Sequence, residues 1–231
     1  MNNQLHNWLL LFALKFSLQA LICRPTSDFN LYAKLEAYSL ATYHALFIAM
    51  SPSIMRHLTT RYHSDTPADF IAANHQTMLT RLAARAIVMR NNQILMLYTQ
   101  RYHDYSLPGG GVDVGEVIEQ GLIRELQEET GAQQIRNINP FGLYEEYRPW
   151  QRDGYTSVNM LSYCFTCDID SQLGETQFEA HEINNGMIPV WIDIDEAIGH
   201  NLDTIANSSK KGLSIERETF LLKLIKQELL S

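Results

Sequence analysis

The sequence has little of three features that would each indicate a class of protein. It holds three cysteines in 231 residues, an odd number that does not suit a disulfide framework. Positive charge is scarce, because 18 Lys and Arg face 26 Asp and Glu, and a formal charge of −8 argues against general DNA or RNA binding. No apolar run reaches the roughly 20 residues that cross a bilayer. We therefore expect an ordinary soluble globular protein without a nucleic-acid or membrane partner.

The longest apolar segment, residues 8–22, is interrupted by Lys15, Ser17 and Gln19. The residues before it contain no Lys or Arg, which a signal sequence would carry there. A packed helix is therefore favoured, and a membrane anchor or signal sequence remains the alternative.

Two of the cysteines, Cys164 and Cys167, form a CxxC pair, which raises the question of a zinc or redox site. Their segment is typical of a strand, in which residues three apart point to opposite faces. No second CxxC exists to complete a zinc site. We expect two buried thiols, which fits a reducing cytoplasm.

The chain divides into two regions by pattern. Residues 1–80 are predicted to be helical, including residues 31–50 and a helix that starts after Pro67 and runs to residue 82. From about residue 83, strand patterns alternate with a helix at 116–130, a short strand at 189–194 and a final helix at 214–230. The prediction is an N-terminal helical region, 1–80, and an α/β domain with a mixed sheet, 81–231. The apolar N-terminal segments suggest a homodimer or partner contact.

The helix at 116–130 carries an unusual cluster of acids near its end. Ile118, Leu122 and Leu126 form its apolar stripe. Glu125, Glu128 and Glu129 lie beside that stripe, where like charges repel and where the helix dipole disfavours them. A solvated acidic face is the ordinary explanation. The alternative is a bound cation, and oxygen-only ligands favour Mg²⁺ or Mn²⁺ over zinc.

A glycine-rich loop, Gly109 to Gly111, precedes this helix. Glycines let the backbone approach a phosphate or metal closely. Gly110, five residues, Glu116, seven residues, and then RELQEETGA from Arg124 to Ala132 resemble the Nudix box, the signature of the Nudix hydrolase family. All seven polar or glycine positions of that signature are matched. The resemblance covers about residues 83–205 and implies an α/β/α sandwich around a mixed sheet.

The resemblance also implies roles for individual residues. Members hydrolyse a diphosphate linked to another group, with Mg²⁺ or Mn²⁺. The implied metal ligands are Glu125, Glu128, Glu129 and the carbonyl of Gly109. Arg124 is implied to orient the glutamates, and Glu116 to have a structural role near the helix start. The base is a helix glutamate or a later loop glutamate, for which Glu182 is preferred to Glu179.

The sequence indicates the substrate less clearly than the reaction. Tyr147, and Tyr102 with His103 before the loop, are candidates to contact a base or sugar, although aromatic side chains more often serve packing. The main hypothesis is a hydrolase of a nucleoside diphosphate linked to a second moiety, such as a nucleotide sugar or an ADP-ribose-like molecule. The alternatives are a nucleoside triphosphate pyrophosphohydrolase and a Nudix-like sensor or regulator.

Overall fold

The computed structural model describes residues 55–152 and 154–230, and residues 53–231 form one compact unit. The predicted helices, apolar segments and dimer contact of residues 1–54 lie outside the described residues and stay predictions. The described elements are, in order, β1 (His57–Tyr62), α3 (Ala68–Asn74), η1 (His75–Thr77), β2 (Met78–Ile87), β3 (Met89–Arg90), β4 (Gln93–Thr99), β5 (Asp104–Ser106), α4 (Ile118–Thr130), β6 (Arg136–Arg152), β7 (Tyr155–Asp168), α5 (Ala180–Asn185), β8 (Met187–Asp193), α6 (Ile194–Asn207) and α7 (Ile215–Leu229). None of these helices is long and apolar enough to cross a membrane.

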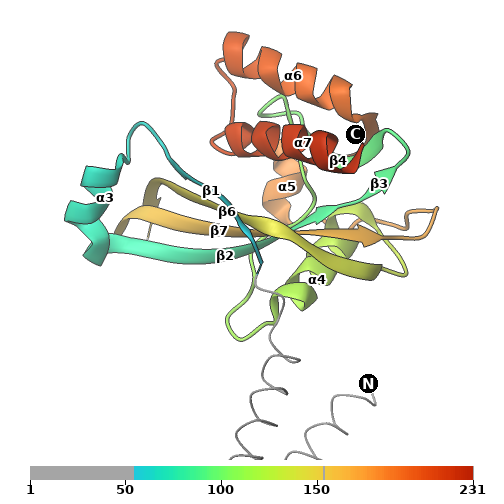
Figure 1. The fold of residues 1–231 in the computed structure, drawn as a ribbon, viewed down its shortest axis with the longest axis horizontal. Helices are drawn as coiled ribbons and strands as arrows, with labels where there is room; N and C mark the ends of the chain where they lie inside the picture. Colours follow the sequence, from blue (N-terminus) through green and yellow to red (C-terminus); the bar gives the residue numbers. More distant parts are fainter. Residues whose placement is uncertain (1–54, 153, 231) are drawn as a thin grey trace, which may run out of the picture. The chain divides into compact units, whose positions relative to one another are not determined.

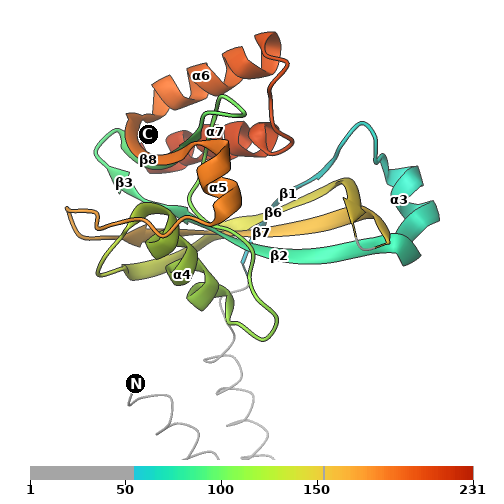
Figure 2. The same cartoon turned by 180° about the vertical axis from the view of Figure 1, so that it is seen from behind.

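The strands form two sheets. The first has the order β1-β6-β7-β2, with β6 and β7 antiparallel and both outer pairs parallel, so it is mixed. In the second, β4 pairs antiparallel with β3, β5 and β8. The helix α4 lies on one side of the sheets, and α6 and α7 lie on the other (Figures 1 and 2). The predicted α/β/α sandwich around a mixed sheet is therefore confirmed.

Alternation along the strands builds two cores. Ala84, Ala86 and Leu95 face the side of α4, where Leu122 and Leu126 are fully buried. The neighbouring strand positions, among them Ile87, Ile94, Met96 and Cys164, face the other side, where they pack with Leu221, Leu222 and Ile225 of α7 in the second core. Each helix layer therefore covers its own apolar face of the sheets.

The prediction of helix up to residue 80 is wrong for part of the described chain. Residues 57–62 form β1, and α3 ends at Asn74, so that β2 already begins at Met78. The segment MLTRLAAR is rich in residues that form helices readily, which is why its local pattern indicated helix. Pairing with β7 along ten residues overrides that preference. The compact unit therefore begins well before the predicted boundary at residue 81.

The two cysteines of the CxxC pair lie in different cores, as predicted for residues three apart in a strand. Cys164 belongs to the core beside α7 and Cys167 to the core beside α4, and both are free thiols. Burial raises the pKa of each thiol to about 12.

Neither Cys164 nor Cys167 should react with a thiol reagent in the folded protein, because a buried thiol of raised pKa offers no accessible thiolate. Thiol titration of a Cys23→Ser variant measures these two alone. The same variant in denaturant should give both thiols as the control. Fast labelling of either thiol under native conditions would contradict the two-core arrangement.

Candidate active site

The helix α4 positions the acidic cluster. Leu122 and Leu126 anchor it to the sheet, and Ile118 packs beside them at the edge of the same core. The helix ends at Gly131, which adopts a left-handed conformation with φ 69° and donates its N–H to the carbonyl of Gln127 at 2.8 Å. The three glutamates thus occupy the last two turns of a helix whose position is set by its buried stripe.

The glycine-rich loop lies along the edge of β2. Ala84 N donates to the carbonyl of Gly110 at 3.0 Å, and Ala86 N donates to the carbonyl of Pro108 at 2.8 Å. Gly109 has φ 128°, and a Cβ there would lie 2.1 Å from the carbonyl oxygen of Ala84. Only glycine fits at this position. A side chain would push the loop away from β2 and break the hydrogen bonds that hold it there.

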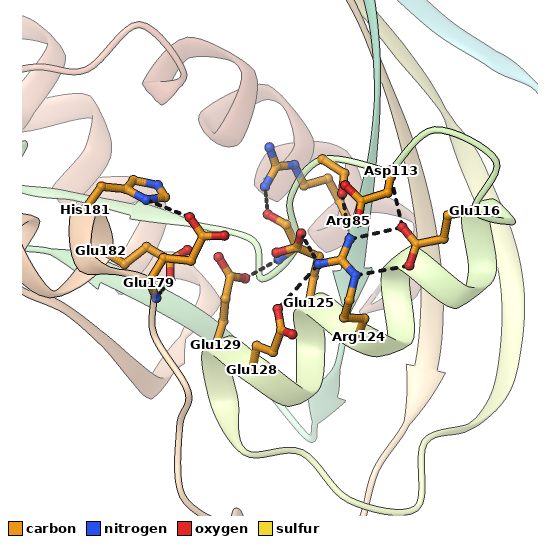
Figure 3. A network of polar contacts seen from close by, with 12 residues as sticks. Arg85, Asp113, Glu116, Arg124, Glu125, Glu128, Glu129, Glu179, His181 and Glu182 are labelled. Atoms are coloured by element: carbon orange, nitrogen blue, oxygen red, sulfur yellow. Dashed lines mark hydrogen bonds and ion pairs between the residues drawn. The ribbon is translucent and has the colours of Figure 1, made fainter.

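The three glutamates have different surroundings (Figure 3). Glu129 is 4% exposed, and its Oε2 accepts a 2.5 Å hydrogen bond from the N–H of Gly109. Burial raises the pKa of Glu129 well above its usual value, against the opposing effect of the Gly109 N–H. The Glu125 carboxylate lies against Gly110, where a Cβ would be 2.4 Å from its Oε2. Burial also raises the pKa of Glu125, while Arg124 lowers it. Glu128 is the most exposed, at 38% of its side chain.

Arg124 connects the cluster to the start of the helix. Its Nε and Nη2 each donate to Glu116 at 3.0 Å, and Nη2 also donates to the carbonyl of Gly111 at 2.9 Å. Its Nη1 donates to Glu125 at 2.7 Å and, more weakly, to Glu128 at 3.4 Å. Glu116 also accepts from Asp113 N at 2.9 Å, so Arg124 and Glu116 together link the glutamates to the loop and to the start of the helix.

A metal ion has no complete protein cage in this arrangement. In the part of the chain that the structure describes, no three His, Cys, Asp or Glu side chains are grouped to hold a metal ion by themselves. The reason is visible in the hydrogen bonds, because Arg124 holds Glu125 while the loop backbone holds Glu129. The predicted backbone ligand, the carbonyl of Gly109, accepts a hydrogen bond from Nη1 of Arg85.

The two candidate loop glutamates lie at α5. Glu182 is 8% exposed, and its Oε2 accepts from Glu179 N at 2.7 Å in a capping box that starts this helix. Its negative charge contributes to the raised pKa of Glu129. Glu179 is 73% exposed and pairs with His181 at 3.0 Å.

The three residues predicted to contact the substrate do not all lie together. Tyr147 stacks on Tyr62 with ring centroids 4.9 Å apart and lines a cavity of about 270 Å³. Tyr102 lies beside Gly212, another residue of that cavity wall. A Cβ placed on Gly212 would lie 3.4 Å from the Cγ of Tyr102. His103 instead contacts the hydroxyl of Tyr98 at 2.8 Å. Tyr147 and Tyr102 therefore lie near one cavity, and His103 is bonded elsewhere.

A buried ionic network, which no motif in the sequence indicated, supports the loop. Glu218 of α7 is fully buried, and its Oε2 accepts from the N–H of Leu107 at 2.9 Å, next to the glycines. Its Oε1 accepts from Arg217 at 2.7 Å, and Arg217 also donates to Glu146 of β6 at 2.6 Å. One available signal was periodicity, since Glu218 stands four residues before Leu222 on the apolar stripe of the last helix. A second signal was Arg85, a charged residue within the apolar strand β2, on which both Arg217 and Glu218 act.

The fold and the site define the class of the protein. A family model described as the NUDIX domain matches residues 79–214, more than half of the chain. The chain belongs to the Nudix hydrolase family, and the motif from Gly110 to Ala132 lies at the loop and helix just described.

Curated relatives match parts of the chain. The NAD-capped RNA hydrolase NudC of Haemophilus influenzae is 29% identical over 116 residues, which are 48% of this chain and 38% of that protein. The RNA pyrophosphohydrolase of Pseudoalteromonas translucida is 49% identical over 47 residues, 20% of this chain and 27% of that one. The chain therefore spans well under two thirds of either relative.

Solved structures of the family resemble the chain at lower identity. A MutT NUDIX hydrolase from Burkholderia pseudomallei is 21% identical, with a TM-score of 0.37 over 50% of this chain and 84% of that one. The E. coli ORF135 protein is 19% identical, with a TM-score of 0.42 over 65% and 94%.

Replacing Arg217 by Met should lower the free energy of unfolding by about 3–5 kcal/mol, because Glu146 and Glu218 would be left buried without their cation. Urea unfolding measures the change. Arg136→Met is the matched control, because its ion pair with Asp170 is about half exposed and should contribute less than about 1 kcal/mol. Equal losses in both variants would contradict a special role of the buried network.

Proposed function

We propose that the protein hydrolyses the diphosphate linkage of a nucleoside diphosphate joined to a second group, with Mg²⁺ or Mn²⁺ as cofactor. The observation that carries the proposal is the buried Glu129, held by the N–H of Gly109 beside Glu125. Glu129 is buried and Glu125 is half-buried at the glycine loop, and together with Glu128 they outnumber the two arginines that act on them, Arg124 and Arg85, which leaves negative charge without compensation. A divalent cation together with substrate phosphates supplies that compensation.

The residues fit such a cation. Glu125 and Glu129 both have raised pKa values because burial disfavours their charged forms, and a bound cation would reverse that effect. Glu125, Glu128, Glu129 and the Gly109 carbonyl would hold it, an all-oxygen donor set that suits Mg²⁺ or Mn²⁺. Such a cation would supply neutralisation of the diphosphate charge and a lower pKa of a bound water.

The side chains of the protein perform the remaining tasks. Arg124 holds Glu125 and Glu128 in place through its bonds to Glu116 and the Gly111 carbonyl. A carboxylate must accept the proton of the attacking water. We propose Glu182 for this role because it is buried and its charge acts on Glu129. Glu179, which is exposed, is the alternative.

The substrate class rests on the site together with the relatives. One relative is named for action on NAD-capped RNA, and NAD is itself a nucleoside diphosphate joined to a second nucleoside. This supports a dinucleotide or ADP-ribose-like substrate alongside nucleotide sugars, with Tyr102 and Tyr147 as the proposed contacts of the second group and His103 as a less favoured one. Both relatives are named for RNA, so RNA ends belong in the substrate screen despite the net charge of −8.

Replacing Glu129 by Gln should lower hydrolysis of the preferred substrate on the order of 10²-fold or more, because the variant loses a charge of the cation site. A screen that separates the phosphorylated products by chromatography identifies that substrate. It covers nucleotide sugars, NAD, ADP-ribose, dinucleoside polyphosphates, nucleoside triphosphates and 5′-modified RNA, each with Mg²⁺ and Mn²⁺. Glu196→Gln, at an exposed position on α6, is the control and should keep full activity.

The screen also separates the alternative functions. Preference for nucleoside triphosphates would favour a nucleotide pyrophosphohydrolase, and a wild-type protein without activity on any substrate would favour a sensor. Full activity of Glu129→Gln would overturn the assignment of the cation site.

Replacing Glu182 by Gln should lower kcat by about 10²-fold or more with little change in KM, because a general base contributes rate and not affinity. The Gln amide oxygen still accepts from Glu179 N, so α5 keeps its cap. Glu179→Gln is the matched control and should change kcat less than about threefold, since this residue is exposed. The reverse result would assign the base to Glu179, and unchanged kcat in both would assign it to α4.

A further inference from the structure

One face of the first sheet carries a row of arginines. The strand register aligns Arg81 of β2 with Met160, Met160 with Glu146 of β6, and Glu146 with Arg61 of β1. Arg85 and Arg148 follow at alternate positions of β2 and β6, so their side chains share this face. It is the face covered by α7 at one end, where Arg217 meets Glu146.

The arginines on this face exceed their counter-charges. Arg217 forms ion pairs with both Glu146 and Glu218, at 2.6 Å and 2.7 Å. Among the described residues, no carboxylate forms an ion pair with Arg61, Arg81 or Arg85; Arg81 instead stacks over the ring of Trp150 at 5.2 Å. Arg148 comes no closer to a carboxylate than 3.9 Å, from its Nε to Oε1 of Glu146. A protein of net charge −8 therefore concentrates positive charge on one face.

Several donors on this face are buried without a hydrogen-bond partner among the described residues. They are Nε of Arg85, Nε of Arg148 and Oγ of Ser162. Ser162 pairs with Tyr144 between the two arginine-bearing strands, on the same face as Met160. Burial lowers the pKa of Arg148, and the neighbouring Arg217, Arg85 and Arg81 lower it further. Buried donors without a partner cost free energy, and an anion is the strongest acceptor for a guanidinium donor. Of the three residues, Arg148 lines the cavity described next.

A cavity opens at this face. Its volume is about 270 Å³, and its cationic wall consists of Arg61, Arg148 and Lys211. Lys211 is exposed and makes only a 3.5 Å contact to the carbonyl of Ile205. The carboxylates of the wall are Glu146, which Arg217 holds, and the exposed Glu216. At roughly 30 Å³ for each water, the space admits a phosphate group together with several waters.

Buried side chains connect the wall of the cavity to the glycine loop of the candidate active site. Arg217 donates to Glu146 of the cavity wall and to Glu218. Glu218 in turn accepts a hydrogen bond from the N–H of Leu107, at the start of the glycine loop. On the same face, Arg85 donates to the carbonyl of Gly109. One buried network therefore holds the loop, where the diphosphate is proposed to lie, and the cavity wall in a fixed position relative to each other.

We propose that this cavity binds a phosphate group of the substrate that is not hydrolysed, through Arg61, Arg148 and Lys211. The inference rests on the proposed function and narrows it to substrates that carry at least one phosphate beyond the cleaved linkage. A neutral sugar at the far end would leave these three cations without a partner. Dinucleoside polyphosphates or phosphorylated second groups are thus favoured over simple nucleotide sugars.

The first test measures binding without catalysis. Inorganic phosphate is titrated into the full-length protein in the presence of EDTA, and NMR shifts of backbone amides around Lys211 and Gly212 report the cavity. Arg148→Gln and Lys211→Gln should each raise the Kd for phosphate about tenfold, the effect of losing one charge-assisted hydrogen bond. Lys211→Gln is at an exposed position and should fold normally.

Lys210→Gln is the matched control, since Lys210 is the adjacent exposed lysine and is not part of the cavity wall. Its Kd should stay within twofold of the wild type. Equal weakening by Lys210→Gln and Lys211→Gln, or no phosphate-dependent shifts at the cavity, would overturn the proposal.

The second test measures selection between a dinucleoside diphosphate and a dinucleoside tetraphosphate. The wild type should prefer the tetraphosphate in kcat/KM, and Lys211→Gln should reduce that preference about tenfold while Lys210→Gln leaves it unchanged. Unchanged preference in Lys211→Gln would count against the cavity. Absence of hydrolysis of either substrate would instead refute the proposed function, while the phosphate titration would still decide the cavity.

Discussion

The close approach of the glycine loop to the edge of β2 is the constraint on which the rest of the site depends. Gly109 passes the carbonyl of Ala84 so closely that a Cβ would overlap it, and Gly110 passes the Glu125 carboxylate in the same way. Because the loop lies there, the N–H of Gly109 reaches Glu129, and the carbonyl of Gly111 reaches Arg124. The backbone of a short loop therefore sets the positions of the charged side chains on α4.

Charge in this protein is distributed by face. The acidic cluster lies at α4, and unpaired arginines lie on the face of the sheet that α7 partly covers. The buried Arg217, with Glu146 and Glu218, stands between the two and binds the loop at Leu107. Buried ion pairs of this kind contribute little net stability but penalise any other arrangement, because a separated partner would remain charged and buried. The network thus favours one position of the loop relative to the arginine face.

Local patterns predicted the helix α4, its buried stripe and its end at Gly131, because each depends on residues within one or two turns. They failed for residues 57–62 and 78–82, which are strands. Those strands exist because they pair with β6 and β7, which lie about 80 residues further along the chain. A local pattern holds no record of such a partner, and Leu, Ala and Arg are compatible with a helix.

By itself, the sequence determined which residues form the acidic motif and that they share one helix, since spacings of three and four place side chains on a common face. It also placed three consecutive glycines shortly before that helix. Only the tertiary structure decided that Glu129 is buried while Glu128 is partly exposed, because that difference depends on the loop laid against α4. It likewise decided that Glu218 reaches Leu107, 111 residues away, and that four arginines from three strands share one face. Such contacts follow from strand pairing and helix packing over long separations, which spacing along the chain does not encode.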